Sequence, residues 1–284
     1  MWAIIGGSGF EKFDGFEVVR ELPRETPFGL CASGFKRVRV GGVEALFLSR
    51  HGAHHEWLPT EVNYRANIFA LKAQGASAIV SFSAVGSLQP EFEPGHMVMP
   101  LQYIDRTKGV RKHTFCGEGI VGHMSLAHPV CESMARKVDE LAKKESFTSH
   151  LGGTYVCIEG PNFSTYAESV SYRELAADII GMTNFPEYAL AREAGMNYLP
   201  CCFVTDFDCW DTSRPHVTLD EVLTIMRQNN AKAFALLKRV LAAGDGLLAD
   251  CECSAQGLRS GLLSREHLTP AQREWLDVLV RTNS

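Results

Sequence analysis

The apolar residues of this chain alternate between short continuous runs and longer periodic segments. The runs have the length and composition of strands buried in a sheet: residues 1–5, 38–48 (a hairpin turning at Gly41-Gly42), 78–82, 95–104, 153–158, 178–182 and 199–208. The periodic segments are typical of helices: residues 59–74, 129–144, 166–176, 186–194, 218–243 and 270–280. This alternation predicts an α/β fold, with a single domain over residues 1–284 in which helices flank a mixed central β-sheet.

The run that begins at Leu199 ends in two carboxylates, Asp206 and Asp208. In an open α/β sheet, ligands bind just beyond the carboxyl ends of the strands. Side chains at i and i+2 point to the same side if the strand continues that far. The pair would suit a ligand edge rich in N–H donors, or one that needs a proton. The alternative is structural, because an Asp at a strand end is often a helix N-cap.

Other predicted strands end in groups that bind anions. These groups are Ser8, Arg50-His51, Ser83-Ala84 and Met182-Thr183. If the strand ends converge, hydroxyls, one Arg and one His gather at one end of a crevice, and carboxylates gather at the other. A phosphate together with a nitrogenous base would satisfy both ends.

Composition and charge limit the kinds of molecule that the protein could bind. The net charge of −5 leaves no basic surface for nucleic acid and no polybasic patch for a membrane. No apolar stretch is long enough to span a bilayer, and Met1 leads directly into a strand, so we expect a cytoplasmic protein. The nine cysteines are scattered and odd in number, which favours reduced thiols.

Three short motifs are weaker evidence. The turn Gly6-Gly-Ser-Gly9 lacks the Lys of a P-loop and the third glycine of a dinucleotide fingerprint, so an NAD-dependent oxidoreductase is a poor alternative. The cluster His51-Gly-Ala-His54-His55 lacks a familiar zinc spacing. We interpret Cys251-Glu-Cys253 as incidental, and we predict no metal.

Motifs distributed from Ile4 to at least Asn229 resemble the trimeric purine nucleoside phosphorylase and methylthioadenosine phosphorylase family. Each motif is short, and their number, order and spacing carry the resemblance: Ile4-Ile-Gly-Gly-Ser-Gly9, Arg50-His-Gly52, Val62-Asn-Tyr-Arg-Ala-Asn67, Ala84-Val-Gly-Ser87, Glu159-Gly-Pro161, Gly181-Met-Thr183, Pro186-Glu187 and Thr205-Asp-Phe-Asp-Cys-Trp210. The resemblance implies phosphorolysis of a purine nucleoside by inorganic phosphate as co-substrate, no cofactor, a homotrimer, and a role in purine and methionine salvage.

The resemblance also assigns roles to residues of this chain. It places phosphate ligands at Ser8, Arg50, His51, Ser83, Ala84 (through its backbone) and Thr183, with His51 among the hydrogen-bond donors. It makes Asp206 the general acid, or the group that shares the proton on purine N7, with Asp208 in support or bound to the amino group. It places the substrate against Phe163, Ser164, Met182 and Leu219, and against His123 of a neighbouring subunit. Asn162 departs from the Arg usual in the family, and Val85 replaces a smaller residue or a thiol.

The pair Asp206 and Asp208 is typical of the methylthioadenosine branch, whereas the 6-oxopurine branch places an Asn there. A carboxylate accepts from a 6-amino group and repels an O6 carbonyl, and such a polarity difference is worth on the order of 10⁴ in selectivity. The resemblance therefore favours phosphorolysis of S-methyl-5′-thioadenosine to adenine and 5-methylthioribose 1-phosphate. The alternatives are a purine or methylthioinosine phosphorylase acting on 6-oxopurines, a nucleosidase that uses water, and a nucleotide-sensing module without turnover.

Overall fold

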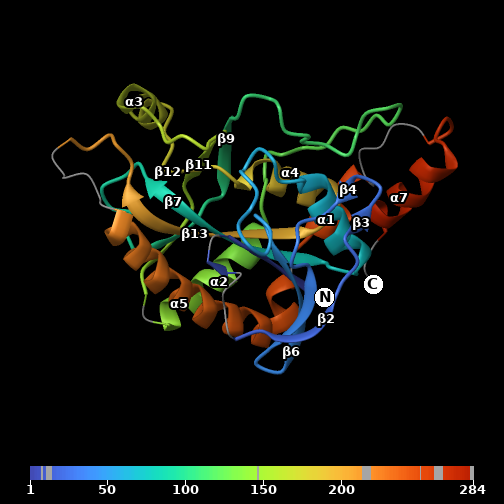
Figure 1. Cartoon of the computed structure of the whole chain (residues 1–284), viewed down its shortest axis with the longest axis horizontal. Coiled ribbons are helices and arrows are strands. Elements are labelled where there is room, and N and C mark those ends of the chain that lie inside the picture. The colour runs from blue at the N-terminus through green and yellow to red at the C-terminus, as the bar shows by residue number, and fades with distance from the viewer. Residues whose placement is uncertain are drawn as a thin grey trace.

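The computed structural model describes residues 1–7, 9–10, 15–145, 147–212, 219–249, 251–258 and 265–281, with backbone only for 219–223 and 254. In this part of the chain an eleven-stranded mixed sheet forms the centre, and helices cover both of its faces (Figure 1). The predicted fold class is therefore confirmed. No described helix combines the length and the apolar character that a membrane span requires.

The sheet is built around β7 (Ala78–Ser87). β1 (Trp2–Gly6) and β13 (Asn197–Phe207) pair in parallel with β7 on either side. The main path runs β10-β8-β13-β7-β1-β6-β5-β2, and β11, β12 and β9 branch from the far end of β7. The remaining strands of this sheet are β2 (Glu17–Glu21), β5 (Lys36–Val40), β6 (Val43–Ser49), β8 (Met97–Met99), β9 (Gln102–Arg106), β10 (Ser149–Leu151), β11 (Thr154–Ile158) and β12 (Ile179–Gly181). A separate two-stranded sheet pairs β3 (Glu25–Thr26) with β4 (Gly29–Leu30).

Residues of the central strands alternate between two apolar cores, because successive side chains of a strand point to opposite faces. On β1, Ala3 and Ile5 pack with α1 (Tyr64–Ala73), α4 (Asn184–Glu193) and α7 (Pro270–Val280). Trp2 and Ile4 pack on the other face with α2 (Glu132–Lys144) and α5 (Leu219–Ala243). α3 (Tyr166–Glu174) lies at the rim of the molecule (Figure 1).

Several predicted boundaries were wrong. The strand predicted for 78–82 continues to Ser87, because β13 extends its pairing and β12 adds to its end, so Ser83 and Ala84 lie inside a strand rather than after it. The helix predicted from residue 59 begins at Tyr64, where the Asn63 side chain accepts from the Ala66 N–H and caps the first turn. The helix predicted from residue 129 begins at Glu132, because Cys131 is extended and donates its N–H to the Tyr198 carbonyl.

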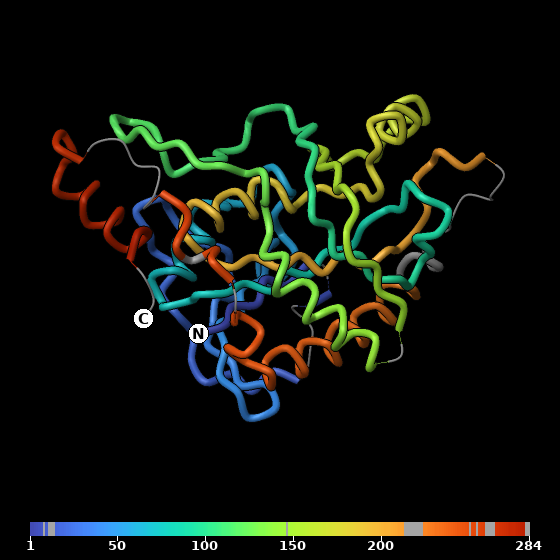
Figure 2. Tube along the Cα trace, turned by 180° about the vertical axis from the view of Figure 1, so that it is seen from behind, coloured from blue at the N-terminus to red at the C-terminus, as the bar shows by residue number. Residues whose placement is uncertain are grey.

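The segment between β9 and α2 has little regular structure, as its composition predicts. Figure 2 shows it (green) running along one edge of the molecule to α7. There the Gln272 side-chain amide donates to the Glu118 carbonyl at 2.8 Å. α7 itself has the predicted bounds, since Thr269 and Gln272 form a capping box around Pro270.

Candidate active site

A cavity of about 420 Å³ lies where β6, β7, β12 and β13 carry their polar strand ends, with α5 closing one side. Its lining includes most residues predicted for the site: Arg50, His51, Phe163, Ser164, Ser83, Ala84, Met182, Thr183, Asp206 and Asp208. Groups that lie far apart in the sequence thus share one hollow.

Arg50 follows β6 and is almost completely buried. Its Nε and Nη2 donate to the Glu187 carboxylate at 2.6 and 2.9 Å, Nη2 donates to Ser81 Oγ at 2.7 Å, and Nη1 donates to the Phe82 carbonyl at 3.1 Å. Burial opposes the charge, but Glu187 outweighs burial and raises the pKa of Arg50. Four of the five N–H groups of a guanidinium are used in this way, which leaves one on Nη1 for a ligand.

Glu187 holds this arrangement from α4. Its carboxylate also accepts from Ser81 Oγ at 2.6 Å and from the Tyr198 hydroxyl at 2.8 Å. A buried ion pair is stable only when additional hydrogen bonds satisfy its remaining polar atoms, and here two hydroxyls do so. In the sequence, Pro186-Glu187 stood out only as part of a motif, and Glu187 received no role. Its partner Arg50 lies 137 residues away.

His51 differs from the donor role that the resemblance implies. Its Nδ1 lies 2.8 Å from the Trp57 carbonyl, which can only accept, so Nδ1 carries the proton. Burial and the neighbouring Arg50 charge lower the pKa of His51 to about 4. The ring is therefore neutral near pH 7, and its Nε2 is an acceptor. A ligand facing Nε2 must supply the proton of that hydrogen bond.

The hydroxyl groups of Ser83 and Thr183 and the closely packed backbone of Gly7 complete the end of the cavity that contains Arg50. Among the described residues, Ser83 Oγ has only the weak acceptor Cys202 Sγ at 3.4 Å, so the hydroxyl can turn to a ligand. Thr183 is the N-cap residue of α4, and its side chain makes no capping bond. At Gly7 a Cβ would lie 2.7 Å from the Phe82 carbonyl, so only glycine fits there. Ser8, which follows it, lies outside the described residues.

The side chains of Asp206 and Asp208 lie next to Gly86 of β7. Asp206 pairs with Gly86 in the sheet after a register shift that follows Val204. A Cβ on Gly86 would lie 3.3 Å from Asp206 Oδ1 and 3.6 Å from Asp208 Cβ, so the missing side chain makes room for both. Both side chains therefore face the cavity, as the i, i+2 spacing predicts.

Burial raises the pKa of Asp206, and the charge of Asp208 raises it further, although Thr205 Oγ1 opposes the shift by donating to Asp206 Oδ2 at 2.6 Å. Burial also raises the pKa of Asp208. Asp208 Oδ2 is buried without a hydrogen-bond partner among the described residues. This end of the cavity can hold a shared proton and can accept from an N–H edge.

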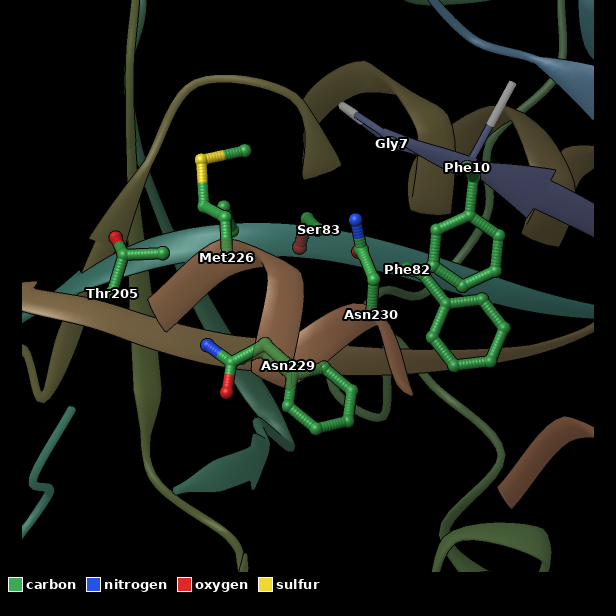
Figure 3. A pocket seen from close by; sticks show the side chains of 10 residues that line it. Gly7, Phe10, Phe82, Ser83, Thr205, Met226, Asn229 and Asn230 are labelled. Atoms are coloured by element: carbon green, nitrogen blue, oxygen red, sulfur yellow. The ribbon is translucent and has the colours of Figure 1, made fainter. Parts of the chain in front are cut away.

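Between these ends the lining is mostly apolar. Met182 and Phe163 both contribute, and Phe163 is 84% exposed in the single chain. Figure 3 shows a small adjoining pocket in which Met226 and Asn229 of α5 lie beside Ser83 and Thr205. The side chain of Leu219, which was predicted to contact the substrate, lies outside the described part of the chain.

His123 is not brought to this cavity by the single chain. It lines a different cavity of about 590 Å³ beside Cys131. The predictions from the sequence also did not include Trp57, Leu58 and Met226, which line the candidate site. Only the chain's three-dimensional path could have revealed them, because they occupy a loop and a helix with no recognisable spacing.

The model of a known family, described as the phosphorylase superfamily, matches residues 2–242. The chain belongs to the phosphorylase superfamily. The S-methyl-5′-thioadenosine phosphorylase of Geobacter sulfurreducens is 43% identical over 98% of this chain and 96% of its own length. That of Rhodospirillum rubrum is 46% identical over 84% of this chain and 81% of its own length.

Solved structures of this superfamily share the fold. A methylthioadenosine phosphorylase from an Antarctic soil metagenomic library has a TM-score of 0.91 and 40% identity, covering 99% of this chain and 98% of that one. A point mutant of the Schistosoma mansoni adenosine/methylthioadenosine phosphorylase, in complex with methylthioadenosine, has a TM-score of 0.80 and 35% identity, covering 87% of this chain and 95% of that one. The predicted family and enzyme class are confirmed.

Proposed function

We propose that this phosphorylase cleaves S-methyl-5′-thioadenosine with inorganic phosphate, yielding adenine and 5-methylthioribose 1-phosphate. The observation that carries the proposal is that one cavity contains Arg50 at one end and the Asp206–Asp208 pair at the other. The names of the relatives that resemble the chain over most of its length agree with it.

Phosphate is proposed to bind between Arg50, Ser83, Thr183, the Ala84 backbone and Ser8. Arg50 is fixed by Glu187 before the ligand arrives, so its charge costs little reorganisation during the reaction. His51 is proposed to accept a hydrogen bond from a phosphate hydroxyl through Nε2. The monoprotonated dianion, HPO₄²⁻, has such a hydroxyl, and binding through it leaves the other oxygens free to face C1′.

The glycosidic bond is proposed to break through an oxocarbenium-like state, as in glycoside hydrolysis, with phosphate attacking C1′ from below the ring. Met182 and Phe163 pack on the sugar, and Leu219 on the apolar 5′ substituent. Adenine leaves with a proton on N7. Asp206 supplies or shares this proton, because burial and Asp208 raise its pKa toward the working pH.

Selectivity for a 6-aminopurine is proposed to reside in Asp208 Oδ2, which is buried without a partner among the described residues. A 6-amino group would satisfy it, whereas a 6-oxo group would face a carboxylate. The competing proposal is a 6-oxopurine phosphorylase, and a protonated Asp208 would permit it, since burial raises its pKa as well.

The working protein is proposed to be a cytoplasmic homotrimer that needs no cofactor. Phe163, Trp57 and Leu58 are exposed around the cavity in a single chain, and a neighbouring subunit would cover such apolar surface. His123 of that neighbour would then lie near the 5′ substituent. Light scattering coupled to size-exclusion chromatography tests the trimer, and a monomer with full activity would refute it.

One spectrophotometric assay tests the function. Methylthioadenosine, adenosine, inosine and methylthioinosine are each compared with and without phosphate. Methylthioadenosine should have the highest kcat/KM, and its cleavage should depend strictly on phosphate. Cleavage without phosphate would indicate a nucleosidase, preference for inosine would indicate the 6-oxopurine alternative, and binding without turnover would indicate a sensing module.

A further inference from the structure

Three cysteines form a cluster outside the candidate active site. The Sγ atoms of Cys131, Cys251 and Cys253 all lie within 4.8 Å of one another, and those of Cys131 and Cys251 are 2.7 Å apart. Cys131 precedes α2, whereas the other two follow the 3₁₀ turn Gly244–Leu248. The cluster therefore joins two segments that lie 120 residues apart in the sequence.

The cluster lies at the opposite end of β13 from the carboxylates. Cys251 Sγ is 3.1 Å from Oδ1 of Asn197, the first residue of that strand, and Cys131 donates its N–H to Tyr198. Nine residues of strand separate Asn197 from Asp206, a distance of about 30 Å. The cluster is thus a separate site from the catalytic cavity.

A buried positive charge beside the cluster requires a negative partner. Arg192 lines the same cavity of about 590 Å³ and is only 2% exposed. Its Nη2 donates to the neutral Gln256 side chain, while Nε and Nη1 have no partner in the described part of the chain. A buried unpaired cation is costly, so the structure calls for an anion here.

Glu132 and Glu252 also line this cavity, but Glu132 already pairs with Arg136, and the clustered thiols become anions when they bind a metal ion. Cys131 stands at the N-terminus of the 13-residue helix α2, where the helix dipole favours a thiolate. The positive charge of Arg192 and this helix end together favour the ionised form that binds metals.

We propose that Cys131, Cys251 and Cys253 bind one Zn²⁺ ion as three thiolates, with a fourth position open to the cavity. Three thiolates and a divalent cation carry a net charge of −1, which the single charge of Arg192 balances. A Cys131–Cys251 disulfide would consume two of the thiols and leave only Cys253 as a possible counter-charge for Arg192, whereas the ion uses all three.

The geometry requires a small adjustment. Tetrahedral zinc with Zn–S bonds of about 2.3 Å separates its sulfur ligands by about 3.8 Å, so Cys131 and Cys251 must move about 1 Å apart on binding. The fourth ligand would be a water molecule or a small thiol, because the cavity opens beside the cluster.

Cobalt(II) substitution tests the proposal on the full-length protein. The protein is freed of metal with a chelator under a thiol reductant, and titration of its nine free cysteines verifies reduction. Adding Co²⁺ should then produce sulfur-to-metal charge-transfer absorption and the intense visible bands of tetrahedral coordination, saturating at one ion per chain. One equivalent of Zn²⁺ should abolish both. Reduced protein that shows neither feature would overturn the proposal.

Variants locate the site. Cys251→Ser and Cys253→Ser should each weaken binding at least about 100-fold, whereas Cys116→Ser, which removes a partly exposed thiol outside the cluster, should bind as the wild type does. Arg192→Gln should weaken binding about 10–100-fold, and Arg192→Lys should restore most of it. Wild-type binding by both cluster variants would refute the assignment. So would a Cys131–Cys251 disulfide in the isolated protein, detected by mass spectrometry without reductant, in place of bound zinc.

Discussion

Replacing Asp206 by Asn tests the proposed proton transfer with little change in shape. Asn keeps an oxygen that can accept the Thr205 hydroxyl bond, which is 2.6 Å long in the wild type. It removes the ability to deliver a proton to purine N7. Because burial disfavours the charged form of Asp206, a neutral Asn should cost the fold little.

The size of the effect follows from the role. A positioned general acid contributes about 10²–10⁴ in rate, which corresponds to about 3–5 kcal/mol of barrier. We therefore expect kcat with methylthioadenosine to fall at least ~10²-fold. The KM for phosphate should change little, because the proposed phosphate ligands on β7, Ser83 and Ala84, precede Gly86, which pairs with Asp206.

Initial rates are measured by the ultraviolet change on adenine release, at saturating phosphate and nucleoside. Asp245→Asn is the matched control, since Asp245 is an exposed carboxylate in the turn after α5. Thermal denaturation of both variants reports folding. If Asp206→Asn is folded and retains turnover within about threefold of the wild type, Asp206 transfers no proton and the proposed mechanism is wrong.

Three further changes test the surrounding electrostatics. Asp208→Asn removes a charge that raises the pKa of Asp206, so the alkaline limb of the kcat/KM profile should move to lower pH; an unmoved limb would mean that the limb does not report Asp206. Glu187→Gln leaves the buried charge of Arg50 unpaired and should lower the free energy of unfolding in urea by about 3–5 kcal/mol, and a loss below about 1 kcal/mol would contradict the buried pair. His51 has a folded pKa of about 4 against its ordinary value of 6.5, so the unfolded chain binds more protons between these values and stability should fall as pH drops from 6.5 to 4. His51→Asn should reduce that slope in pH-dependent unfolding, and an unchanged slope would assign it to other groups.

The strands of the sheet could be predicted because each buried strand is a short apolar run bounded by turn residues, a pattern that is visible in the local sequence. The bounds of α7 were predictable for a similar reason, since Thr269, Pro270 and Gln272 form a start signal within four residues. The extension of β7 to Ser87 was not, because it depends on pairing with β12 and β13 from distant parts of the chain. Pairing of this kind leaves no local pattern.

The chemical types of the side chains at the site could be predicted from the sequence, but the hydrogen bonds and ion pairs between them could not. Arg50 was expected to bind phosphate, but the sequence did not indicate that most of its donors are bound to Glu187, Ser81 and Phe82. The tautomer of His51 depends on a carbonyl that the sequence cannot place. Cys251-Glu-Cys253 was interpreted as incidental because it lies in a late connecting segment, and the sequence does not show that Cys131, 120 residues earlier, lies beside it.

The separation between the two ends of the cavity follows from one strand. Arg50 is anchored beside Ser81 and Phe82 on β7, and Ser83 faces the same end, whereas Asp206 pairs with Gly86 further along. Three residues separate Ser83 from Gly86, a distance of about 10 Å at the rise of a strand. A pentose fits between an anion at the first position and a base edge at the second.

The register of β13 on β7 thus determines the distance between the proposed phosphate site and the carboxylates that face the proton-accepting atom of the base. A one-residue slip of β13 would move the carboxylates by about 3.3 Å and turn them to the other face. The bulge after Val204 therefore matters for the proposed reaction, because it sets which face of β13 carries Asp206 to the cavity.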